Sequence, residues 1–104
     1  MSKSVTTINP IHPGEILRAE FLDELGLSAR ALAMHLGVPT NRITRVINGQ
    51  SAMTAETASL LAAALNTTPE FWMNLQLRFD METARADQGI VARVSAIPAL
   101  AMVG

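Results

Sequence analysis

The feature that most restricts the fold of this chain is a pair of short helical segments separated by a glycine and a proline. The apolar spacing predicts one helix over Ala29–Leu36 and another over Thr40–Ile47. Gly37 suits a left-handed turn, and Pro39 keeps Val38 from continuing the first helix. Because helices of about nine residues are too short to be stable alone, the pair indicates a compact motif of two helices joined by a tight turn.

Three longer helical segments flank this pair. A proline in the first turn and apolar residues at helical spacing predict a helix over Pro13–Leu25. Thr54 is a suitable N-cap for a helix that ends at Asn66. Thr68, followed by a proline and a glutamate, begins another helix that extends to about Asp87. Five helices are therefore expected, which makes the chain all-α.

The segment that follows Gln88-Gly89 is apolar, and Arg93 is its one charged residue. The Gln88-Gly89 dipeptide is expected to end the preceding helix, so an extended apolar C-terminal tail is predicted. The alternation around Arg93 also permits a short strand over Ile90–Ile97. The predicted organisation is a flexible arm over residues 1–11, a folded domain over 12–87 and the tail over 88–104.

The composition narrows the class of protein. The 104 residues are enough for one compact domain. The chain has no cysteine, which excludes disulfides and thiolate metal sites. No signal-peptide pattern and no apolar stretch of about 18 residues occur, so a cytoplasmic protein without membrane contact is expected.

The charge distribution is more informative than the formal net charge of −1. No Asp or Glu occurs from Gly26 to Ala55, whereas Arg30, Arg42 and Arg45 all fall in that window. The acidic residues that crowd the segment just before it are Glu15, Glu20, Asp23 and Glu24. A basic middle with acidic flanks is typical of a chain that meets a polyanion with one face, although a solvated surface can give the same pattern.

The second helix of the short pair has a polar face suited to nucleic acid. Once Ile43, Val46 and Ile47 are assigned to the core, its outward residues are all hydrogen-bonding side chains. Arginine can pair with guanine and asparagine with adenine in a major groove, and the start of the first helix suits a phosphate. The predicted DNA-binding residues are Ser28, Arg30, Thr40, Asn41, Arg42, Thr44, Arg45 and Asn48. The alternative is a structural helical hairpin whose polar face is merely solvated. The two helices are expected to cross at Ala33, where a small side chain is needed.

No constellation of catalytic or metal-ligating residues is visible. The two histidines, His12 and His35, have no carboxylates or thiols that complete a ligand set. No serine has a paired base at readable spacing, and no glycine-rich phosphate loop occurs. We therefore expect no enzyme, no cofactor and no metal. His12 is expected to precede or cap the first helix, and His35 to lie on the outer side of its helix.

The last predicted helix is apolar on two faces. Trp72, Leu75 and Phe79 recur at core spacing, and a second apolar stripe lies on nearly the opposite side. Such a stripe needs a partner, so a homodimer or a contact with another protein is expected. The residues predicted to make this contact are Met73, Leu77, Met81, Ile90 and Val94. Folding of the tail back onto its own domain is the open alternative.

Three segments together carry a resemblance to a known family: His12-Pro13-Gly14-Glu15, Arg45-Val46-Ile47-Asn48-Gly49, and Thr68-Pro69-Glu70-Phe71-Trp72 leading into Leu75-Gln76. From His12 to about Ala84 the sequence resembles the HigA-type antitoxins of bacterial toxin–antitoxin modules, within the Cro/repressor-like (XRE-type) helix-turn-helix family. The resemblance implies a lambda-repressor-like domain.

The function implied by the resemblance has two parts. An antitoxin of this type binds and neutralises a RelE-like, mRNA-cleaving toxin, and it represses its own operon from a palindromic operator. Ala29 departs from the family where related repressors often carry a glutamine that contacts phosphate, and Pro39 replaces the usual hydroxyl cap of the recognition helix. A free-standing transcriptional repressor without a toxin partner is the alternative function.

Overall fold

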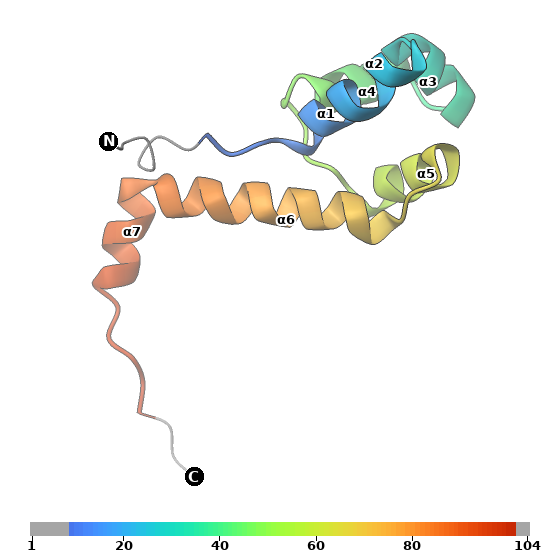
Figure 1. The fold of residues 1–104 in the computed structure, drawn as a ribbon. Helices are drawn as coiled ribbons and strands as arrows, with labels where there is room; N and C mark the ends of the chain where they lie inside the picture. The colour runs from blue at the N-terminus through green and yellow to red at the C-terminus, as the bar shows by residue number, and fades with distance from the viewer. Residues whose placement is uncertain (1–8, 102–104) are drawn as a thin grey trace.

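The computed structural model describes residues 9–101 as a succession of helices (Figure 1). The first is continuous from α1 (Pro13–Ile16) through the π-helical segment η2 (Leu17–Leu22) to α2 (Asp23–Leu25). The others are α3 (Ala29–Leu36), α4 (Thr40–Ile47), α5 (Ala55–Leu65), α6 (Pro69–Ala86) and α7 (Gln88–Ser95). Residues 9–101 therefore contain six helices and no strand, and the predicted bounds of the first three helices are confirmed. Most of the expected N-terminal arm lies outside the described residues.

Local sequence sets the ends of these helices. The hydroxyls of Ser28, Thr54 and Thr68 accept hydrogen bonds from the backbone N–H three residues further on, at 3.0, 3.2 and 3.0 Å. These bonds satisfy donors that a helix N-terminus leaves free. Gly26 and Asn66 end their helices in the left-handed conformation, with φ of 63° and 60°. The capping predicted for Thr54 and the helix start predicted at Thr68 are thereby confirmed.

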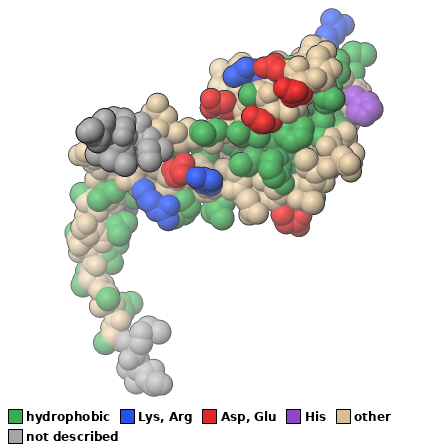
Figure 2. Space-filling view, in the orientation of Figure 1, with side chains coloured by type: hydrophobic (Ala, Val, Ile, Leu, Met, Phe, Trp, Pro, Cys, Tyr) green, Lys and Arg blue, Asp and Glu red, His purple; other side chains and the backbone are tan. Residues whose placement is uncertain are grey.

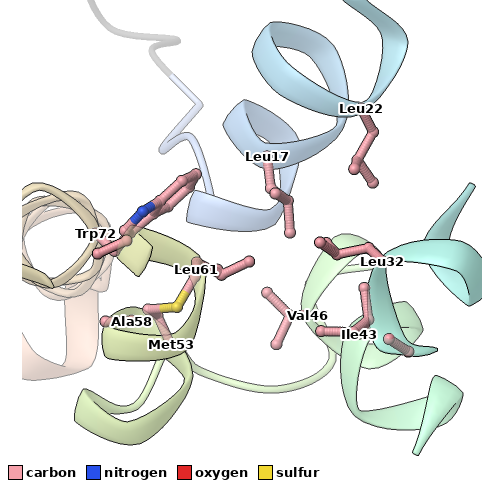
Figure 3. Packing of buried hydrophobic residues seen from close by; sticks show 11 residues of the cluster. Leu17, Leu22, Leu32, Ile43, Val46, Met53, Ala58, Leu61 and Trp72 are labelled. Atoms are coloured by element: carbon pink, nitrogen blue, oxygen red, sulfur yellow. The ribbon is translucent and has the colours of Figure 1, made fainter. Parts of the chain in front are cut away.

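One hydrophobic core joins the first helix, α3, α4, α5 and the start of α6 (Figure 3). Trp72 is fully buried, and its Nε1–H donates to the Thr67 hydroxyl at 2.8 Å. Ile43 and Val46 project from α4 into the same core, so packing fixes the orientation of that helix. The buried core residues are Leu17, Leu22, Leu32, Ala33, Ile43, Val46, Met53, Ala58, Leu61, Ala62 and Trp72.

The prediction of five helices followed by an extended tail is wrong for the tail, because a sixth helix, α7, forms there. The break after α6 is confined to Asp87, whose backbone is extended with φ −84° and ψ 109°. The Asp87 Oδ1 accepts from the Ile90 N–H at 3.1 Å and so caps a new helix, α7. This cap overrides the turn tendency of Gln88-Gly89, and the strand permitted over Ile90–Ile97 does not form. After α7, residues 97–101 have no regular secondary structure.

The last helix and the residues after it project away from the rest of the molecule (Figure 1). The Cα radius of gyration is 17.6 Å, compared with about 13 Å for a compact domain of this length. In the described residues the tail therefore does not fold back onto the core. None of the helices described is long and apolar enough to span a membrane.

Candidate nucleic-acid interface

The two short helices α3 and α4 are joined by a tight turn. Gly37 adopts φ 75° and ψ 33°, a conformation that other residues rarely take. The Val38 N–H donates to the Ala33 carbonyl at 3.0 Å, which closes the end of α3. Ala33 itself is fully buried, as expected from its predicted place at the helix crossing. The turn thus holds α4 at a fixed angle to α3.

The polar residues of α4 are exposed on the side away from the core. Thr40, Asn41, Thr44, Arg45 and Asn48 recur at i, i+1, i+4, i+5 and i+8, so they share one helical face. Thr44 is half-buried and its hydroxyl donates to the Asn41 carbonyl at 3.3 Å, whereas the other four side chains are exposed. Arg42 is half-buried at the edge of this face, on the side of α5.

Two further predicted residues lie at the start of α3. Ser28 caps the helix through its side chain, and Arg30 is exposed beside it. No ion pair in residues 9–101 involves Arg30 or Arg45. Acidic side chains instead gather over the first helix (Figure 2). In the described residues, therefore, no ion pair joins Arg30 or Arg45 to the acids that precede them in the sequence.

The proline before α4 leaves the helix start without a side-chain cap. Pro39 occupies the N-cap position with φ −62° and ψ 144°, and it makes no capping hydrogen bond. Its carbonyl nevertheless accepts from the Arg42 N–H at 3.1 Å, and the helix begins at Thr40 as predicted. No capping side chain therefore accepts a hydrogen bond from the backbone N–H groups at the start of α4.

The segment His12-Pro13-Gly14 docks the first helix on the end of α4, a role that the sequence did not reveal. A Cβ on Gly14 would overlap the backbone of Val46, so only glycine allows this approach. The Nδ1 of His12 accepts from the Gly14 N–H at 2.9 Å, and the imidazole meets the Phe79 ring edge-on with centroids 4.9 Å apart. The capping expected of His12 is confirmed. His35 is exposed, as expected.

A buried glutamine of α6 holds the loop between α4 and α5. The Gln76 Oε1 accepts from the Met53 N–H at 2.6 Å, and its Nε2 donates to Asp80 at 2.9 Å. Since both ends of the amide are paired, this polar group is buried at little cost. Spacing in the sequence did not predict this contact, because the loop partner lies on a different element.

A shallow groove of about 350 Å³ separates α4 from the start of α5. Its walls come from Asn41, Arg42 and Arg45 on one side and from Thr54 and Glu56 on the other. Across it, Arg42 Nη1 lies 3.5 Å from Glu56 Oε2. Glu56 is the first acidic residue after the stretch Gly26–Ala55, and the fold places it beside α4. No pattern in the sequence indicated that Glu56 lies at this site.

The residues predicted to contact a partner are mostly exposed. Leu77 and Met81 of α6 are 59% and 41% exposed, and Ile90 and Val94 of α7 are 40% and 63% exposed. Met73 differs, because it is half-buried and packs against the core of its own chain. A groove of about 270 Å³ between α6 and α7 is lined almost entirely by apolar atoms. Figure 2 shows hydrophobic side chains open along this part of the molecule.

No group of three or more His, Cys, Asp or Glu side chains that could hold a metal ion occurs in the described part of the chain. In the same residues, the hydrogen bonds of the serine and threonine hydroxyls involve backbone groups, another threonine or Trp72. The pair α3 and α4 carries hydrogen-bonding and cationic side chains on its exposed face.

The helix-turn-helix family matches residues 17–72, which includes α3, its turn and α4. Antitoxin HigA-1 of Vibrio cholerae is 44% identical over 80 residues, which are 77% of this chain and 75% of that protein. The chain belongs to the HigA-type antitoxin family. The resemblance drawn from the three sequence segments is therefore confirmed.

Solved structures of this antitoxin family agree with the assignment. The antitoxin GraA in complex with its operator is 41% identical, with a TM-score of 0.82 over 98% of this chain and 100% of that one. The Pseudomonas aeruginosa antitoxin HigA with the higBA promoter is 40% identical, with a TM-score of 0.79 over 88% of this chain and 99% of that one.

Proposed function

We propose that this HigA-family chain is a sequence-specific DNA-binding antitoxin that represses its own operon from a palindromic operator. The observation that carries the proposal is the exposed polar face of α4, held rigidly by buried Ile43 and Val46. Its residues are able to read base edges in a major groove. Family members of the same fold have been crystallised with operator or promoter DNA, which supports this reading.

The residues divide between base and phosphate contacts. Asn41 and Arg42 lie in the first half of α4, and Arg45 lies on its exposed face. These are the parts of a recognition helix that meet base edges. Ser28 and Arg30 stand at the N-terminus of α3, where the helix dipole and the guanidinium both favour a phosphate. With alanine at position 29, Arg30 and backbone amides carry that phosphate contact.

Two arginine variants test this division. Arg42→Ala is expected to weaken binding to the selected sequence by about 1–3 kcal/mol and to relax discrimination at one base position. Arg30→Ala is expected to weaken binding to all sequences and to reduce the salt slope by about one contact. Titration of a duplex selected from a random pool, and of its scrambled counterpart, measures both. Equal loss on both duplexes for Arg42→Ala would assign that residue to phosphate.

The second part of the proposal concerns protein partners. The exposed stripe of Leu77, Met81, Ile90 and Val94 is suited to a homodimer, which would present two recognition helices to two half-sites. Family membership also supports neutralisation of a RelE-like mRNA-cleaving toxin, for which the chain needs a toxin-binding surface. A cytoplasmic protein with these two partners requires neither a cofactor nor catalysis.

Co-expression with the product of the neighbouring gene tests the toxin partner. For an antitoxin, the neighbouring gene alone should arrest growth, and the chain should restore growth and co-purify with its product. If the neighbouring product is harmless and does not co-purify while DNA binding is intact, the chain is a free-standing repressor instead.

A further inference from the structure

The ion pair between Arg42 and Glu56 differs from the other ion pairs in the described residues. Arg18–Asp23 and Arg78–Glu82 each join residues within one continuous helix, whereas Arg42–Glu56 joins α4 to α5. It also holds an arginine at the edge of the proposed DNA-reading face. An acid this close to a nucleic-acid surface repels phosphates, so its presence calls for a function.

We propose that Glu56 is a specificity-determining residue, which positions the Arg42 guanidinium for a base edge and keeps it from nearby phosphates. This inference rests on the proposed DNA-binding function. Glu56 acts through Arg42 and makes no base contact of its own, so it is a positioning residue.

The geometry supports a positioning role. Glu56 lies in the first turn of α5, and Thr54 caps that helix through a bond to the Thr57 N–H at 3.2 Å. Thr57 is buried, so the backbone that carries Glu56 is firmly placed. Arg42 has rotatable bonds enough to reach a phosphate or a base. The Glu56 side chain is 73% exposed, but it starts from this fixed backbone and its carboxylate lies 3.5 Å from the guanidinium, which biases that choice.

The charge balance predicts how specificity changes. An exposed ion pair biases the side-chain position by a factor of about two to five. With the carboxylate present, Arg42 contributes little to DNA of arbitrary sequence. Without it, the guanidinium is free to pair with a phosphate, which adds about one released counterion on any duplex. Loss of Glu56 is therefore expected to raise non-specific affinity and to lower discrimination.

The test titrates the full chain against two duplexes at several salt concentrations. One is the duplex that the unaltered chain selects from a random-sequence pool, and the other is a scrambled duplex of equal composition. Glu56→Gln is expected to raise the affinity for the scrambled duplex about two- to fivefold and to steepen its salt slope by about one. The affinity for the selected duplex is expected to stay the same or fall.

Two further variants separate the contact from the charge. Glu56→Asp keeps the charge but shortens the side chain by one methylene. It is therefore expected to reduce discrimination between the selected and the scrambled duplex, as Glu56→Gln does. Glu70→Gln is the matched control, because Glu70 occupies the same position after the N-cap Thr68 and is exposed. It is expected to leave both affinities unchanged. In an Arg42→Gln background, Glu56→Gln is expected to have no effect on discrimination.

The outcomes distinguish the inference from the function on which it rests. If Glu56→Gln raises both affinities equally, or if Glu56→Asp behaves like the unaltered chain, Glu56 acts only through its charge and the inference is wrong. If the unaltered chain selects no sequence from the pool, the DNA-reading function itself is wrong. Circular dichroism of each variant confirms that the altered chains are folded.

Discussion

The helical body, residues 12–79, and the C-terminal arm, residues 80–101, differ in how far they bury their apolar side chains. The body places Leu17, Leu32, Ile43 and Trp72 fully out of solvent in one core. In the arm no described residue is buried, and Leu100 is 87% exposed. The body thus has a buried core of its own, whereas exposing the apolar surface of the arm to water costs about 25 cal/mol per Å².

Under the function proposed above, this difference gives the two regions separate tasks. Reading of DNA needs side chains held within a fraction of an ångström, which only a packed core supplies. Joining two copies, or a toxin, needs open apolar surface, and the arm together with the adjoining Leu77 offers several such side chains close together in sequence, among them Ile90, Val91 and Val94. Substitutions in the body should therefore cost stability, and substitutions in the arm should cost association.

The largest expected effect contrasts two glycines. Gly14→Ala should destabilise the fold by about 3 kcal/mol or more, because the new methyl group overlaps the backbone of Val46 and backbone cannot move aside cheaply. Gly89→Ala in the arm meets only the Asp87 carboxylate at 3.2 Å and replaces glycine within a helix, so its effect should lie within about 1 kcal/mol of zero. Urea denaturation measures both, and similar losses would remove the distinction between body and arm.

The helix crossing of the body gives the next effect. Ala33→Leu should cost about 2–3 kcal/mol through overpacking, because Ala33 is fully buried between α3 and α4. Ala63→Leu, at an exposed position of α5, is the matched control and should change the free energy of unfolding by less than about 0.5 kcal/mol. An unaffected melting temperature in Ala33→Leu would place the crossing elsewhere.

The buried amide of Gln76 gives a smaller effect. Gln76→Leu keeps the volume but leaves the Met53 N–H without its acceptor at 2.6 Å, which should cost about 1–2 kcal/mol. DNA affinity should fall as well, because the loop before α5 loses its anchor. Asn74→Leu, exposed on the same helix, should do neither. Thermal denaturation and DNA titration of the two variants would show whether the anchor is real.

The body could be predicted from the sequence because its signals are local. The caps at Thr54 and Thr68, the turn at Gly37 and the apolar spacing of α4 all act within a few residues, and they gave correct helix starts. Of the residues expected to face outward from α4, four are exposed, whereas Arg42 and Thr44 are half-buried. The His12 cap is local in the same way, since it spans two residues.

The remaining features depend on contacts between elements. Gly14 is needed because of Val46, and Arg42 is paired because α5 returns Glu56 to it. Periodicity within one helix contains no information on either contact. In the arm, the dipeptide Gln88-Gly89 indicated a break, but the preceding Asp87 acts as a cap and begins a helix. Two local signals compete there, and the N-cap prevails over the turn dipeptide.

The smallest effect on the fold, and the largest on assembly, is expected from the exposed stripe. Leu77→Asp combined with Met81→Asp should change the stability of the folded chain by less than about 0.5 kcal/mol beyond any loss of dimer contacts. The control is Leu25→Asp, since Leu25 is 60% exposed and Leu77 is 59% exposed. The control should associate like the unaltered chain.

Sedimentation equilibrium of the unaltered chain and of the Leu77→Asp, Met81→Asp variant tests the division of tasks most directly. The account predicts a dimer at tens of micromolar for the unaltered chain and a folded monomer for the variant. That monomer should still bind one half-site but lose its preference for inverted half-sites about 10 base pairs apart. An unaltered chain that sediments as a monomer, or a variant that remains dimeric, would contradict it.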